Sequence, residues 1–125
     1  SGLGSDNLWG TAANWVDNTP PQPGDAVVFP AGTPRLGPDN NRTVNLGFQS
    51  IQVGGTGYRI TGNSVLLFSG VTFSAAPGNA VSILDLPLVL STNLTTNLTA
   101  HVATPDSTLS IDGDIAVGHV GRVLR

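Results

Sequence analysis

The sequence predicts an all-β fold for a single domain of 125 residues. Three observations indicate this class. The chain contains no Lys, Glu or Met, residues that favour helices. Gly, Pro, Asn, Asp, Ser and Thr, which favour turns, recur along its whole length. Between these turn formers lie short stretches of Val, Ile, Leu and Phe, whose side chains suit a pleated sheet. We therefore expect short strands joined by turns, with essentially no helix.

Residues 1–41 are expected to form an irregular cap followed by a connecting loop. The first part is polar, carries Trp9 and Trp15, and shows no periodic pattern. Large indole rings could cover the open end of a sheet, where apolar side chains and unpaired backbone are exposed. A short apolar strand over 26–29 stops at a proline, and a loop rich in Pro and Gly is expected over 30–41.

Residues 42–125 are expected to form a region of repeated strands. Apolar residues alternate with polar ones at two-residue spacing, which is typical of half-buried strands, and turn residues end each stretch. The alternating positions are Val44, Leu46 and Phe48; Ile51 and Val53; Tyr58 and Ile60; Val65 to Phe68; Val71 and Phe73; Val81 and Ile83; Leu86, Leu88 and Leu90; Leu94, Leu98 and Val102; Leu109 and Ile111; Ile115 and Val117.

Short strands at even spacing are compatible with a β-solenoid, a β-barrel, or a β-sandwich such as a jelly roll. Asn and Gly at many corners favour the solenoid. The near repeat over 93–99, Asn-Leu-Thr-Thr-Asn-Leu-Thr, also suggests stacked equivalent positions. No fixed repeat length emerges, so the sandwich remains the alternative.

The opening of the chain resembles that of the autotransporter-associated β-strand repeat proteins of bacteria. The resemblance is carried by Leu8-Trp9, by Ala12-Ala13-Asn14-Trp15, and by the run from Pro20 to Phe29. The stretches 43–46, 51–53 and 58–62 are similar to the first turns of that family. The resemblance implies a right-handed parallel β-helix with a Trp-bearing cap, in a secreted or surface-displayed passenger segment without catalysis of its own. The later glycine-rich turn with a Lys is missing here, which fits a fragment of a longer protein.

Composition excludes several classes of partner. The net charge is −3 and the chain has no basic cluster, so the counterion release that drives nucleic-acid binding is not available. The sequence also has no apolar run long enough for a membrane helix. Without Cys there is no disulfide framework and no thiol chemistry.

Candidate sites are few, and for each a structural role is the better explanation. Asp112 and Asp114 flank a glycine and could hold Ca²⁺ through carboxylate oxygens, but further acids are missing nearby and a solvated turn between two strands explains them better. Trp9, Trp15 and Tyr58 could form a sugar-stacking platform, although we expect them to cover a core. His101 and His119 are too few for a metal cluster. We assign no catalytic residue and no cofactor.

The hypothesis that follows is a non-catalytic structural or adhesion segment, secreted or at the bacterial cell surface. A glycan-binding module and an oligomeric assembly protein of the capsid or decoration type are the alternatives, and a β-helix polysaccharide lyase is the enzyme alternative. The strand pattern persists to the last residues without a second cap. We therefore expect the C-terminal end to contact the remainder of the polypeptide or a second copy, through Val117, Val120, Val123 and Leu124.

Overall fold

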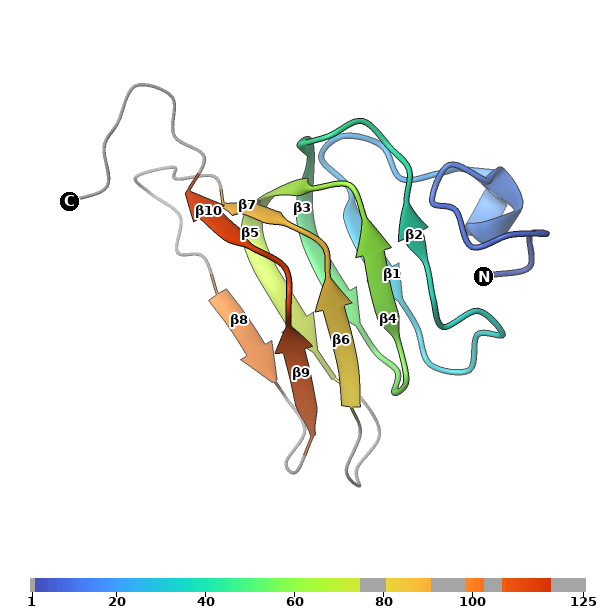
Figure 1. Cartoon of the computed structure of the whole chain (residues 1–125). Coiled ribbons are helices and arrows are strands. Elements are labelled where there is room, and N and C mark those ends of the chain that lie inside the picture. The colour runs from blue at the N-terminus through green and yellow to red at the C-terminus, as the bar shows by residue number, and fades with distance from the viewer. Residues whose placement is uncertain (1, 75–80, 91–98, 103–106, 118–125) are drawn as a thin grey trace.

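The computed structural model describes residues 2–74, 81–90, 99–102 and 107–117, of which 99–102 and Val117 are described by their backbone (Figure 1). In these ranges the protein is almost entirely β, as the composition predicts. Two three-residue 3-10 helices lie near the N-terminus, and all other regular elements are strands. The helices are η1 (Ala12–Asn14) and η2 (Val16–Asn18). The strands are β1 (Ala26–Phe29), β2 (Asp39–Asn40), β3 (Leu46–Val53), β4 (Arg59–Gly62), β5 (Val65–Phe73), β6 (Val81–Asp85), β7 (Leu88–Leu90), β8 (Thr99–Val102), β9 (Thr108–Ile111) and β10 (Ile115–Val117).

The strands form two sheets, and every strand pair in the described part is parallel. One sheet has the order β1-β3-β5-β7-β10, with β8 also paired to β5, and the other has the order β2-β4-β6-β9. Up to β7 the chain passes from one sheet to the other at each step, so each strand pairs with the next strand of its own sheet. Figure 1 shows this as a progression of colour across both sheets.

The longest strands change which side chains they bury part-way along. In β3, Phe48 is buried, and after a register shift between Phe48 and Ser50 the buried apolar residues are Ile51 and Val53. Such an irregularity bends a strand and re-aims the side chains that follow it. The bend divides β5 as well, since its first part pairs with β7 and its second part with β8. Neighbouring strands therefore keep equivalent side chains in line.

The core lies between the two sheets and is built from one side chain of each alternating pair. It runs from the N-terminal cap to β7, Leu109 and Ile111 of β9 are only partly buried against it, and polar residues occupy few of its positions. Its apolar members are Trp9, Val27, Phe29, Phe48, Ile51, Val53, Tyr58, Ile60, Val65, Leu67, Val71, Phe73, Leu84, Leu86 and Leu88. Most of these residues stand at the alternating positions predicted from the sequence.

Several details of the predicted pattern are wrong. Val44 lies in a turn before β3 and is 58% exposed, and Ile115 of β10 is 57% exposed. In β6 the buried residues are Ser82 and Leu84, whereas Val81 is 48% exposed. The polar Ser82 is tolerated inside because its hydroxyl donates to the Gly55 carbonyl (2.8 Å) and accepts from the Tyr58 amide (3.2 Å). The loop expected over 30–41 also contains the short strand β2.

Candidate functional site

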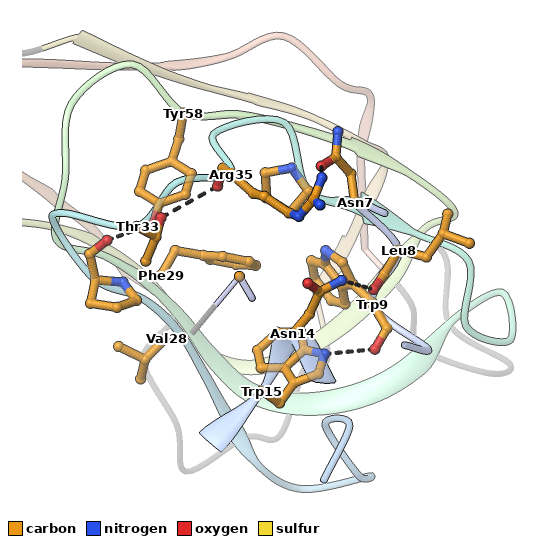
Figure 2. Close-up of a pocket in the computed structure, with 13 residues that line it drawn as sticks. Asn7, Leu8, Trp9, Asn14, Trp15, Val28, Phe29, Thr33, Arg35 and Tyr58 are labelled. Carbon is orange, nitrogen blue, oxygen red and sulfur yellow. Dashed lines mark hydrogen bonds between the residues drawn. The ribbon is translucent and has the colours of Figure 1, made fainter. Parts of the chain in front are cut away.

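The two tryptophans lie in an aromatic cluster at the N-terminal end of the core (Figure 2). Trp9 is only 1% exposed, and its ring centroid lies 5.4 Å from that of Phe29, 5.9 Å from that of Phe48 and 6.1 Å from that of Trp15. Phe29 continues the cluster to Tyr58, at 5.7 Å. Tilted and edge-on ring pairs at these distances add to the stabilisation from burial alone. The cap predicted from the tryptophans is therefore a packed layer on the first strands.

Polar side chains hold Trp9 in place from both sides. Asp6 accepts from the Leu8 amide (3.0 Å) and from the Thr11 hydroxyl (2.9 Å), which fixes the turn before Trp9. These hydrogen bonds, the one from Thr11 first, lower the pKa of Asp6 because they favour the charged carboxylate. The backbone carbonyl of Trp9 in turn accepts from the indole nitrogen of Trp15 at 2.7 Å.

The cap is also tied to the loop that follows β1. The guanidinium of Arg35 donates to the Gly4 carbonyl (3.0 Å from Nε, 2.5 Å from Nη2) and to Asn7 Oδ1 (3.0 Å). On the other side of this loop the Tyr58 hydroxyl donates to the Pro30 carbonyl (2.5 Å) and lies 2.7 Å from the Thr33 hydroxyl. The sequence pattern does not reveal these roles, because all of them join residues far apart in the chain.

A small cavity remains between the aromatic rings and the loop. It holds about 40 Å³ and is bordered by Trp9, Trp15, Phe29, Arg35 and Tyr58. Sites for small organic ligands usually measure about 300–1,000 Å³. The space therefore admits a few water-sized molecules and is too small for a sugar ring.

The three rings of the candidate sugar platform do not share an open face. Trp9 and Tyr58 are 1% and 2% exposed, and only Trp15 is partly exposed. The indole nitrogen of Trp9 is buried and has no hydrogen-bond partner among the described residues. An unmet buried donor costs about 1–3 kcal/mol, which the ring packing must offset. This arrangement suits a core layer better than it suits stacking on a glycan.

Asp112 and Asp114 lie at the opposite end of the molecule, in the turn between β9 and β10. Both are exposed, and the Ser110 hydroxyl donates to Asp112. In the described ranges no group of three or more His or Asp side chains is arranged to hold a metal ion. Gly113 between them lies against the Leu86 backbone, where a Cβ atom would overlap the Leu86 carbonyl. The turn predicted from the sequence is thus placed between the two predicted strands.

The predicted C-terminal contact residues are described only in part. Val117 is the last residue of β10 and pairs with Leu90 of β7, while Val120, Val123 and Leu124 lie outside the described residues. His101 stands in β8, and His119 also lies outside the described residues. The structure thus brings together the cap residues, but it does not join them to the Asp112 turn or to β10.

One internal polar group was not foreseen from the sequence. Asn40 is 1% exposed, and its amide donates to the Asn63 carbonyl of the next corner (2.8 Å) while its Oδ1 accepts from the Arg42 amide (3.0 Å). Asn63 donates in the same way to the Arg42 carbonyl (2.8 Å). Two successive corners of the sheets are therefore linked by asparagine side chains.

Comparisons with protein-family models, with curated proteins and with solved structures give no match for this chain. Within the described ranges, none of the helices has the length and apolar character needed to cross a membrane.

Proposed function

We propose that this chain is a non-catalytic structural segment that forms the capped N-terminal end of a parallel β-solenoid. The observation that carries the proposal is the order of parallel pairing. Up to β7, the strands of each sheet pair in the order in which the chain reaches them, and the chain alternates between the two sheets. A chain that winds around one core produces this order, because each turn lies on the previous one.

The register supports repeated turns. Along one line of positions Val28 stands beside Gln52, Gln52 beside Thr72, and Thr72 beside His101. A second line on the other sheet runs through Ile60, Leu84 and Ile111. An antiparallel sandwich, the alternative, would not place these residues side by side in the same direction.

The difference between the two ends supports a terminal role. At the N-terminal end, the aromatic cluster and the pairing of Leu8 with Asp39 cover the first turn. At the other end of the described stack, Ile115 is 57% exposed although it stands in line with the buried Leu88. We propose that the remainder of the polypeptide, or a second copy, continues the stack at that end.

Secretion or display at the bacterial cell surface is part of the same proposal. It draws on the resemblance of the Trp-bearing opening to autotransporter-associated repeats and on the charge-poor, Lys-free and Cys-free composition. A scaffold of stacked turns needs no reactive site, and its task would be to hold other parts of the protein away from the cell. The proposed role is therefore mechanical, without cofactor or catalysis.

Trp15 offers the sharpest test against the glycan-binding alternative, because it is the one partly exposed ring of the cluster. We expect Trp15→Ala to lower the melting temperature, since Trp15 packs on Trp9 and Phe29. We also expect the unmodified chain to show no specific retention on a glycan array. Specific retention that is lost in Trp15→Ala without a change in melting temperature would replace the structural proposal with a glycan-binding one.

A further inference from the structure

The cap closes the edge of only one of the two sheets. In one sheet, the segment Asn7–Trp9 borders β2: the Trp9 amide donates to the Asp39 carbonyl (2.9 Å), and the Asp39 amide donates to the Asn7 carbonyl (2.8 Å). In the other sheet, β1 is the first strand and pairs with β3 alone among the described residues. Within the described ranges, one strand position at the capped end is therefore filled, and the equivalent position beside β1 is not.

The backbone of β1 has hydrogen-bonding groups on its outer side. The carbonyls of Asp25 and Phe29 accept from the amides of Gln49 and Gly54, both at 2.8 Å, so these alternate residues face β3. Because the direction of backbone groups alternates along a strand, the N–H and C=O groups of Ala26 and Val28 face away from β3. An unpaired edge of this kind is a template for another strand.

A groove of about 260 Å³ runs along this edge. It is bordered by Trp15, Val16 and Pro21 from the cap and by Ala26 and Val28 from β1. The side chains of Val16 and Val28 are 72% and 46% exposed, so the groove has apolar walls beside polar backbone groups. An extended peptide that adds to a sheet uses this combination, with the backbone supplying hydrogen bonds and alternate side chains filling pockets.

The opposite end of the same sheet carries a strand that matches this position. β8 has four residues like β1, runs in the same direction, and among the described residues pairs only with β5. Both strands stand in one line of the register, in which Val28, Gln52, Thr72 and His101 are successive neighbours. A second copy shifted along the stack would thus bring its His101 next to Val28.

We propose that β1 binds β8 of a second copy as an added parallel strand, with Ala26 and Val28 supplying the backbone hydrogen bonds. The inference rests on the proposed function, because it needs a stack whose far end is open. The contact joins two different surfaces, so it extends into open chains of molecules and does not close a dimer. The cap covers the rest of this end, so the contact is confined to one strand and is weak.

Disulfide trapping tests the register, because the chain has no cysteine of its own. Val28→Cys and His101→Cys chains are mixed under mild oxidation, and we expect a covalent pair that joins one chain of each kind. The control mixes Gln52→Cys with His101→Cys, since Gln52 lies in the same line but already has strand neighbours on both sides. Equal trapping in the two mixtures, or none in the first, would overturn the proposal.

A proline variant tests the edge without disturbing the fold. Val28→Pro removes an N–H that faces away from β3, which an edge strand tolerates. We expect the average mass of the unmodified chain in sedimentation to rise as concentration approaches about 1 mM, where weak contacts are populated. Val28→Pro should associate about tenfold more weakly at an unchanged melting temperature. A strictly monomeric unmodified chain, or equal association of both, would overturn the proposal, while the solenoid itself would stand because the melting temperature reports it separately.

Discussion

The two ends of the described stack are built from the same kind of strand but differ in what covers them. At the N-terminal end, Trp9 and Phe48 are buried at 1% and 0% exposure under an aromatic layer. At the far end, Leu109 and Ile111 are only partly buried, and Ile115 is 57% exposed. Repeated strands thus place apolar side chains at both ends, while the stability of each turn depends on its neighbours. We expect substitutions to have large effects near the cap and small effects at the far end.

The largest expected effect comes from the centre of the cap. Trp9→Ala should lower the free energy of unfolding by about 3–5 kcal/mol, because it removes a buried ring and leaves a cavity. Ile115→Ala, at a position that is more than half exposed, should change it by less than about 1 kcal/mol. Urea unfolding followed by circular dichroism measures both. Similar losses for the two variants would contradict the difference between the ends.

The second-largest expected loss of stability is at Gly62, the last residue of β4. Gly62 has φ +111°, and a Cβ atom there would lie 2.5 Å from the backbone of Asn40. Gly62→Ala should therefore cost about 2–4 kcal/mol, from overlap and from an unfavourable backbone conformation. Gly24→Ala is the matched control, since Gly24 also has a positive φ (+89°) but nothing lies within 4 Å of the added carbon. An equal loss of stability in both variants would show that the close approach of the Asn40 backbone is not the reason for a glycine at position 62.

The buried asparagine gives a smaller effect. Asn40→Ala should cost about 1–3 kcal/mol, because the Arg42 amide and the Asn63 carbonyl lose their partner inside the protein. Asn41→Ala, at the exposed neighbouring position, removes only a hydrogen bond from the Gly10 amide and should cost about 0.5 kcal/mol. Thermal unfolding of the two variants side by side measures how much the buried hydrogen bonds of Asn40 stabilise the protein. A smaller loss of stability for Asn40→Ala than for Asn41→Ala would show that the hydrogen bonds of Asn40 do not stabilise the fold.

The smallest expected effect is on the stability of the protein at acid pH. The pKa of Asp6 is lowered below its ordinary value of 3.8 in the folded protein, mainly by the Thr11 hydroxyl. A lowered pKa contributes stability above the unfolded-state value, and this contribution is lost as the pH falls through the folded-state value. The melting temperature of the unmodified chain should therefore fall more between about pH 5 and pH 2 than that of Asp6→Asn. Identical pH profiles would show that the turn at Asp6 does not depend on its charge.

Much of the fold could be predicted from sequence because burial follows the two-residue alternation. Phe48, Ile51 and Val53 are buried as predicted, and Gly54 and Gly55 lie between strands, whereas Ser69 and Gly70, expected at a turn, stand within β5. The prediction failed in β6, where Val-Ser-Ile-Leu can alternate in either phase and the hydrogen bonds of Ser82 select the phase that buries it. The local sequence does not indicate which phase is buried, because the hydrogen-bond partners of Ser82, Gly55 and Tyr58, lie in another part of the chain.

The packing of Trp9 and Trp15 on the core was also expected, but the hydrogen bonds that hold the N-terminal segment were not. Trp9 and Trp15 stood out because large rings are rare in this chain. The contacts of Arg35 with Gly4 and Asn7 join positions about thirty residues apart, and no spacing rule indicates them. The open edge of β1 likewise follows from the pairing of strands, which is a property of the whole fold.

Amide hydrogen exchange compares the two ends most directly, because it measures the local free energy of opening at each backbone position. If the stack is closed by the cap and open at the far end, the amides of Ile51 and Val53 in β3 should exchange slowest. Those of Ile115–Val117 in β10 should exchange much faster, since β10 pairs only with β7 among the described residues. Equal protection of β3 and β10 would contradict the account, because it would mean that the far end is covered as well as the capped end.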